Sequence, residues 1–101
     1  MTDQTPQAIL NAAADLIERT GWTQGHYAHD KDGHPCQPRS SSAVCFCALG
    51  ALEAQRLNDE QMGSAHEELA WRVGASVSLW NDHPDRTKEE VIAALRGVSN
   101  D

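Results

Sequence analysis

One uncharged run constrains the fold of this chain more than any other feature. It reads SSAVCFCALGAL, over residues 41–52, and it combines cysteines, a phenylalanine and leucines with small residues. Drawn as a helix, the run is apolar on most of its circumference, which is typical of a central, buried helix. We expect that helix over about 42–57. Gly50 lies inside it, and a glycine there indicates the close approach of a neighbouring element.

Start signals predict three further helices. Thr5 is followed by a proline, which suits the first turn of a helix. Asn58 precedes a glutamine by three positions and Thr87 precedes Glu90 by three, which is the spacing of a capping box. With the central helix, the predicted helices span about 6–20, 42–57, 59–80 and 88–98.

The segment between the first two helices has a different character. Residues 22–37 contain the sequence DKDG, a turn signal that ends in a glycine. We therefore expect a small β-hairpin over about 22–37, in which Pro35 limits the second arm to edge character. The predicted fold is mainly α: one compact four-helix domain over residues 1–101, with a small hairpin between helices one and two.

The charge balance narrows the choice of partners. The 101 residues include 15 acidic and 8 basic side chains, which gives a net charge of −7. The basic residues are scattered, so direct binding to nucleic acid is not expected. No run approaches the roughly 20 apolar residues that span a bilayer, and no signal peptide is recognisable. We expect a cytoplasmic protein whose partner is another protein, with a homodimer as a further option.

Histidines and cysteines near the hairpin form a candidate metal site. Zinc prefers four nitrogen or sulfur ligands in tetrahedral geometry. His29 and Cys47 belong to the wider group, but no pair has the C-x-x-C spacing of common zinc sites. The candidate zinc ligands at the junction of hairpin and helix are His26, His34, Cys36 and Cys45.

A cysteine nucleophile is the second chemical hypothesis. A cysteine in the first turn of a helix has its thiolate favoured by the helix dipole. Cys45 would be that nucleophile, with His26 or His34 as base, Gln24 as oxyanion donor and Asn81 or Asp82 orienting the base. Each of these residues also has a structural interpretation, in which Asn81 ends a helix and Asp82 begins a turn.

The two cysteines of the central run should differ in accessibility. On a helix they are about 200° apart, so that one faces the core when the other faces outward. Cys47 shares its face with Ala48 and Ala51, and we expect it to be buried. Cys45 should be the more accessible thiol.

Several motifs together resemble one known family. GWTQG, a D-x-D-G turn, CALGAL and WNDHPDRTKEEV are similar to a family of small bacterial and phage proteins classed as a domain of unknown function. The resemblance implies a coherent fold over nearly the whole chain and supplies no function. We expect no cofactor. Cys36 and Cys45 do not match its motifs, which weakens the zinc hypothesis. Trp80 directly precedes Asn81 in the WND motif. The positions that carry the resemblance are Trp22, Gln24, Gly25, Cys47, Ala48, Gly50, Ala51, Leu52, Asn81, Asp82, Thr87 and Val91.

The leading functional hypothesis is a small binding or regulatory protein, of mobile-element origin, with no catalysis of its own. Its basis is the small size, the dispersed charge and the lack of an assembled catalytic set in the sequence. Zinc binding at the hairpin–helix junction is the main alternative, and a cysteine-dependent enzyme is the other.

Overall fold

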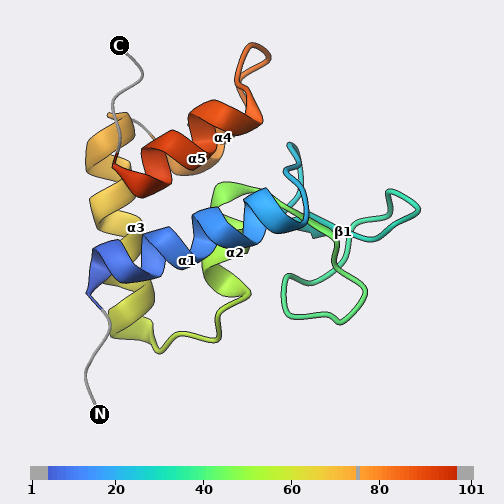
Figure 1. Ribbon diagram of the computed structural model, residues 1–101, viewed down its shortest axis with the longest axis horizontal. Helices are drawn as coiled ribbons and strands as arrows, with labels where there is room; N and C mark the ends of the chain where they lie inside the picture. The colour runs from blue at the N-terminus through green and yellow to red at the C-terminus, as the bar shows by residue number, and fades with distance from the viewer. Residues whose placement is uncertain (1–4, 75, 98–101) are drawn as a thin grey trace.

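The structure is a computed structural model that describes residues 5–74 and 76–97. These residues form five helices and two short strands (Figure 1). In chain order the elements are α1 (Pro6–Arg19), β1 (Ala28–His29), β2 (Cys45–Phe46), α2 (Ala48–Glu53), α3 (Asp59–Val73), α4 (Val77–Asn81) and α5 (Lys88–Arg96). The mainly α fold with a small antiparallel sheet after the first helix is confirmed. The prediction of four helices is wrong, because the third predicted helix is divided in two.

The predicted central helix over 42–57 is much shorter in the structure. Its first part is strand β2 instead, because the backbone N–H of Phe46 donates to the carbonyl of Gly21 at 3.0 Å and that of Cys47 donates to Tyr27 at 3.1 Å. These hydrogen bonds to distant segments replace the bonds that a helix would make within the run. Helix α2 therefore begins only at Ala48.

The division of the predicted helix over 59–80 occurs at Gly74. This residue ends α3 in the left-handed conformation, with φ 70°, and its N–H donates to the carbonyl of Ala70 at 2.9 Å. A left-handed glycine stops a helix because the chain leaves the helical direction there. A separate short helix, α4, then starts at Val77.

The predicted hairpin over 22–37 is present in part, because the N–H of Cys36 donates to the carbonyl of Ala28 at 3.1 Å and the N–H of Asp30 donates to that of His34 at 2.9 Å. Strand β1 lies within its first arm, but β1 pairs with β2, with Ala28 opposite Phe46 and His29 opposite Cys45. Pro35 contributes only an isolated bridge to His29. The DKDG turn is present, and the chain makes a long excursion through it before it returns to the sheet.

The helix starts agree with their capping signals. The Thr5 hydroxyl accepts a hydrogen bond from the N–H of Ala8, and complete capping boxes begin α3 at Asn58 and α5 at Thr87. Helix α5 ends at Arg96, and residue 98 of the prediction lies outside the described residues. None of the described helices is long and apolar enough to cross a membrane.

Helix α1 lies at the centre of the fold. It packs against α5, α2 and α3, and it crosses the molecule in front of α2 in Figure 1. Gly50 of α2 permits a very close approach: a Cβ atom at this position would lie 1.8 Å from the carbonyl oxygen of Tyr27. The expected neighbour of Gly50 is thus present, and it is a backbone segment. The largest fully buried side chains are Ile9, Leu10, Ile17, Leu52, Leu69, Leu95, Val77, Val91 and Asn81.

Arg72 of α3 joins three helices. Its guanidinium donates to the carbonyls of Ala94 and Leu95, both at 3.1 Å, in the last turn of α5. It also donates to the side chain of Gln7 on α1, and it forms an ion pair with Glu68. A cation at the C-terminal end of α5 suits the negative end of the helix dipole.

Candidate functional site

Asn81 brings together three segments that are far apart in the sequence. It is the last residue of α4 and is 1 % exposed. Its Oδ1 accepts hydrogen bonds from the indole Nε1 of Trp22 at 2.8 Å and from the backbone N–H of Ala48 at 3.1 Å. Its Nδ2 donates to the carbonyl of Thr23 at 3.2 Å and to Oδ1 of Asp82 at 3.0 Å. All the hydrogen-bonding capacity of the side chain is used, as a buried amide requires.

The neighbouring motif residues strengthen the same junction. The Gln24 side chain donates from Nε2 to the carbonyls of Asn81 at 3.0 Å and His83 at 2.7 Å, so it satisfies backbone groups at the end of α4. The backbone N–H of Gly25 donates to Oδ1 of Asp82 at 2.9 Å. The W-x-Q-G and W-N-D elements of the sequence are therefore two halves of one contact.

This junction forms one wall of a cavity of about 430 Å³. Small-molecule sites in proteins have volumes of this order, roughly 300–1,000 Å³. The cavity lies between the loop that leads into β1, the start of α2 and helix α4. The residues that line it are Gly25, His26, Tyr27, Ala28, Pro35, Cys36, Cys47, Leu49, Val77, Ser78, Asn81 and Asp82.

Cys47 contributes a buried thiol to the cavity wall. It is 6 % exposed and stands at the N-cap position of α2, where its Sγ accepts a hydrogen bond from the N–H of Gly50 at 3.2 Å. Burial raises the pKa of this thiol above its usual value, despite the opposing effect of the backbone N–H groups of Gly50 and Leu49. The protonated thiol is a poor nucleophile, so Cys47 acts here as a cap and a packing group.

The burial of the two cysteines of the central run agrees with the sequence analysis. Cys47 is buried and Cys45 is half-buried. The helical geometry from which this difference was predicted is absent, because Cys45 lies in β2 and Cys47 is extended. The strand neighbour Phe46 is buried as well.

Of the residues proposed for a cysteine enzyme, Gln24 contacts Asn81, and the proposed nucleophile Cys45 lies elsewhere. His26 and Asn81 line the cavity, whereas Cys45 and Gln24 are not among its lining residues. Cys45 lies against Gly21, because a Cβ atom added to Gly21 would be 2.8 Å from the Sγ of Cys45. The Asn81 amide is fully occupied by the contacts described above and has no capacity left to orient a base.

The proposed zinc ligands are likewise divided. His26 and Cys36 line the cavity, and His34 and Cys45 do not. Within residues 5–74 and 76–97, one group of three or more histidine, cysteine or acidic residues has ligand atoms within 4.8 Å of one another, and it includes only His34 of the four. The zinc hypothesis therefore lacks an assembled ligand set in the described part of the chain.

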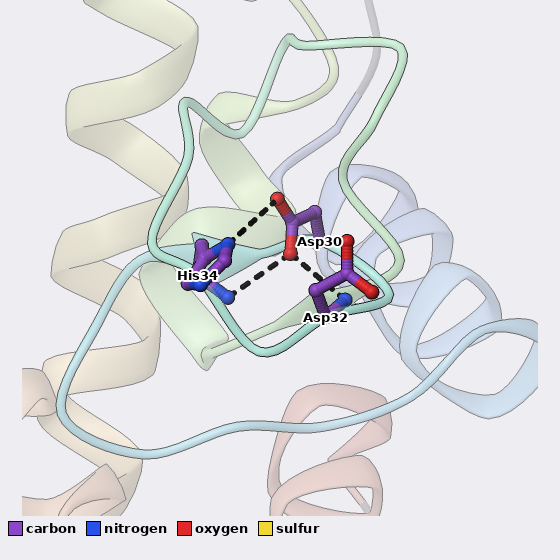
Figure 2. Close-up of side chains that lie close together, drawn as sticks. All are labelled: Asp30, Asp32 and His34. Carbon is purple, nitrogen blue, oxygen red and sulfur yellow. Dashed lines mark hydrogen bonds and ion pairs between the residues drawn. The ribbon is translucent and has the colours of Figure 1, made fainter.

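That group is Asp30, Asp32 and His34, at the DKDG turn (Figure 2). Oδ1 of Asp30 accepts hydrogen bonds from the backbone N–H groups of Asp32 at 2.9 Å and His34 at 3.0 Å. These bonds, led by the one from His34, lower the pKa of Asp30. An aspartate at the start of a turn makes such contacts with its own backbone. The turn conformation accounts for Asp30, and Asp32 and His34 are exposed.

Two large apolar side chains are exposed to solvent, one on α3 and one on α4. Trp71 is 80 % exposed and Leu79 is 75 % exposed. Shallow hollows flank the Trp71 indole, and Glu67 lines both of them. Trp71 was not among the residues singled out from the sequence. The available signal was its position two residues after the buried Leu69, which places it off the inner face of α3.

One of three comparisons with known proteins finds a match. No curated protein and no solved structure matches the chain. One family model matches it over residues 1–101, and that family is described as a family of unknown function. The resemblance inferred from the sequence motifs, to an uncharacterised family of this kind, is thereby confirmed. The chain belongs to the family of unknown function DUF6197.

Proposed function

We propose that this protein is a small binding protein, without catalysis of its own, that contacts another protein through Trp71. The exposed indole of Trp71 is the observation that carries the proposal. Tryptophan offers the largest apolar side chain, and it is enriched among the residues that dominate binding energy at protein interfaces. Leu79 of α4 is another exposed large apolar side chain, and it lines neither of the hollows beside Trp71.

The charges around Trp71 define the chemistry of the partner. The exposed carboxylates of Glu67 and Glu68 line a hollow beside the indole together with Ser64. The whole chain has a net charge of −7, which would attract a basic surface and repel an acidic one. The partner we propose is a protein with an apolar pocket for the indole, bordered by lysine or arginine side chains.

The free cysteines support a proposal for the cellular compartment of this protein. Cys36, Cys45 and Cys47 form no disulfide. Thiols stay reduced in the cytosol, and three thiols in a chain of this size fit that compartment. We therefore propose a cytoplasmic protein.

The test is a comparison of the wild-type protein with Trp71→Ala. Each tagged protein is used to recover partners from an extract of its own cells, and the recovered partner is purified and titrated by calorimetry. We expect Trp71→Ala to weaken binding by about tenfold or more, the level of an interface hot spot. Leu79→Ala is the matched control and should weaken binding less. Both variants should melt at the wild-type temperature, because neither side chain is buried.

Two results would contradict the proposal. Equal affinity of the wild-type protein and Trp71→Ala for the purified partner would exclude Trp71 as the contact. Sedimentation equilibrium provides the other: a wild-type dimer that Trp71→Ala converts to monomer would assign the surface to a second copy of this chain.

A further inference from the structure

We infer that the cavity beside α4 binds a small molecule with an apolar body and a cationic group, and that Asp82 pairs with the cation. This site is separate from the proposed Trp71 interface, because the two share no lining residue. The inference rests on the walls of the cavity, on the hydrogen bonds of Asp82 and on the charge of the chain.

The walls offer an apolar body a place to bind. Leu49 of α2 and Pro35 of the loop after β1 offer accessible apolar surface, and the lining also includes the buried Val77 of α4 and Ala28 of β1. The Cys47 thiol adds a further apolar surface, since its raised pKa keeps it uncharged. Ligand sites typically combine such walls with a few polar groups that set the orientation of the ligand.

Asp82 is the acidic residue of the lining, and no lysine or arginine accompanies it. Two donors hold its carboxylate: the N–H of Gly25 and the amide of Asn81 both donate to Oδ1, at 2.9 and 3.0 Å. Within the described residues, Oδ2 accepts no hydrogen bond from the protein. Because the side chain is also exposed, Oδ2 is accessible to a ligand in an orientation that is fixed before binding.

A fixed carboxylate at the edge of an apolar cavity discriminates by charge. An ammonium or guanidinium group would form a charge-assisted hydrogen bond with Oδ2, whereas an anionic ligand would be repelled by it. The net charge of −7 acts in the same direction, because it raises the local concentration of cations around the protein.

Three probes of nearly equal size test the inference: 2-phenylethylammonium, 2-phenylethanol and 3-phenylpropionate. Each is titrated into the isotopically labelled protein, and the backbone amide resonances of residues around the cavity are followed by NMR. We expect the ammonium probe to bind at least tenfold more tightly than the alcohol, and the carboxylate probe to bind least. The shifts should be largest at the amides of Leu49 and Ser78.

Asp82→Asn is the decisive variant, because an asparagine retains an oxygen that can accept from Gly25 and Asn81. We expect it to abolish the preference for the ammonium probe and to leave the melting temperature nearly unchanged. Asp85→Asn is the matched control, since Asp85 lies in the same loop and does not line the cavity. It removes the same charge and should retain the preference.

The outcomes separate the components of the inference. Equal binding of all three probes would overturn the role of Asp82, and an absence of shifts around the cavity with every probe would overturn the site itself. Loss of the preference in both aspartate variants would assign the effect to net charge and would also overturn the role of Asp82. Trp71→Ala should bind the ammonium probe like the wild type, so the result does not depend on the proposed protein interface.

Discussion

Cys47 shows how one side chain has two structural roles. Its sulfur accepts the hydrogen bond that caps α2, and its burial contributes to the core. Serine is among the best N-cap residues, whereas alanine cannot cap at all. The two replacements should therefore have different consequences, even though both are small.

We expect Cys47→Ala to lower the free energy of unfolding by about 1–2 kcal/mol, because it removes the cap. Cys47→Ser should cost less than about 1 kcal/mol, since its hydroxyl accepts from the N–H of Gly50 and offsets the burial of a polar atom. Urea denaturation of the two variants measures the difference. A larger loss for serine than for alanine would show that packing of the sulfur matters more than the cap.

The raised pKa of Cys47 also predicts a pH dependence of stability. The thiol of the unfolded chain ionises near its usual value of 9.0, and that of the folded chain ionises at higher pH. Between these values the folded state holds more protons, so the stabilisation is complete below pH 9 and is lost as the pH rises through the folded pKa. Wild-type stability should therefore fall relative to Cys47→Ser above pH 9, by at most about 1.4 kcal/mol per pH unit. Parallel curves for the two proteins between pH 7 and 10 would contradict this.

At the scale of the elements, two glycines provide a matched pair. Both lie in helices, Gly50 in α2 and Gly63 in α3, where alanine has the higher helix propensity by about 1 kcal/mol. A Cβ atom at Gly50 would collide with the carbonyl of Tyr27 at 1.8 Å, whereas one at Gly63 would meet nothing within 4 Å. The backbone of Tyr27 cannot yield without breaking its bond to Cys47.

We expect Gly63→Ala to raise the free energy of unfolding by about 0.5–1 kcal/mol, because the alanine lies in open space and favours the helix. Gly50→Ala should lower it by about 2 kcal/mol or more, because the overlap exceeds what a packed core tolerates. Thermal unfolding of the two variants, followed by circular dichroism, gives the comparison. Similar melting temperatures for both would mean that the Tyr27 backbone and α2 are not in the close contact described above.

The elements that sequence predicted correctly are those with local signals. The capping boxes at Asn58 and Thr87 lie within one helical turn, so the sequence nearby is sufficient to recognise them. Strand β2 was missed because the backbone hydrogen bonds of Phe46 and Cys47 go to residues twenty or more positions earlier. A short window of sequence around the strand does not contain these partners. The break at Gly74 was missed because the apolar spacing continues across it.

Several residues of the candidate site were predicted from local motifs, but their contacts were not, because the partners are distant in the sequence. The family motifs identified Trp22, Gly25, Asn81 and Asp82 as important, but neither their contact nor the cavity followed from their types. Trp22 and Asn81 are 59 positions apart, and the sequence around either residue does not indicate that it contacts the other. Conversely, the proposed zinc ligands were near one another in the sequence, and the fold divides them, with His26 and Cys36 at the cavity and His34 and Cys45 outside its lining.

At the scale of the whole molecule, the Asn81 amide joins the segment after α1 to the start of α2 and the end of α4. Asn81→Leu keeps the branched shape of the side chain and leaves the indole N–H of Trp22 and the buried N–H of Ala48 without their acceptor. An unsatisfied buried donor costs about 1–3 kcal/mol, so we expect a loss of roughly 2–6 kcal/mol from the pair. Urea denaturation measures the loss.

Trp22→Phe is the control for that prediction, because it removes one of the donors and keeps the acceptor. The two substitutions affect the same hydrogen bond, so the double variant should lose less than the sum of the single losses. Additive losses would mean that the indole and the amide do not depend on each other.

The hydrogen bond from Ala48 to Asn81 also makes one amide proton an internal reporter. Ala48 is the first residue of a six-residue helix, and such an N–H normally exchanges with solvent as readily as the helix end frays. Here its acceptor belongs to a side chain 33 positions further along the chain. The exchange rate of the Ala48 proton therefore follows the detachment of α4 from the rest of the protein, and it would measure how often the cavity wall opens in the native state.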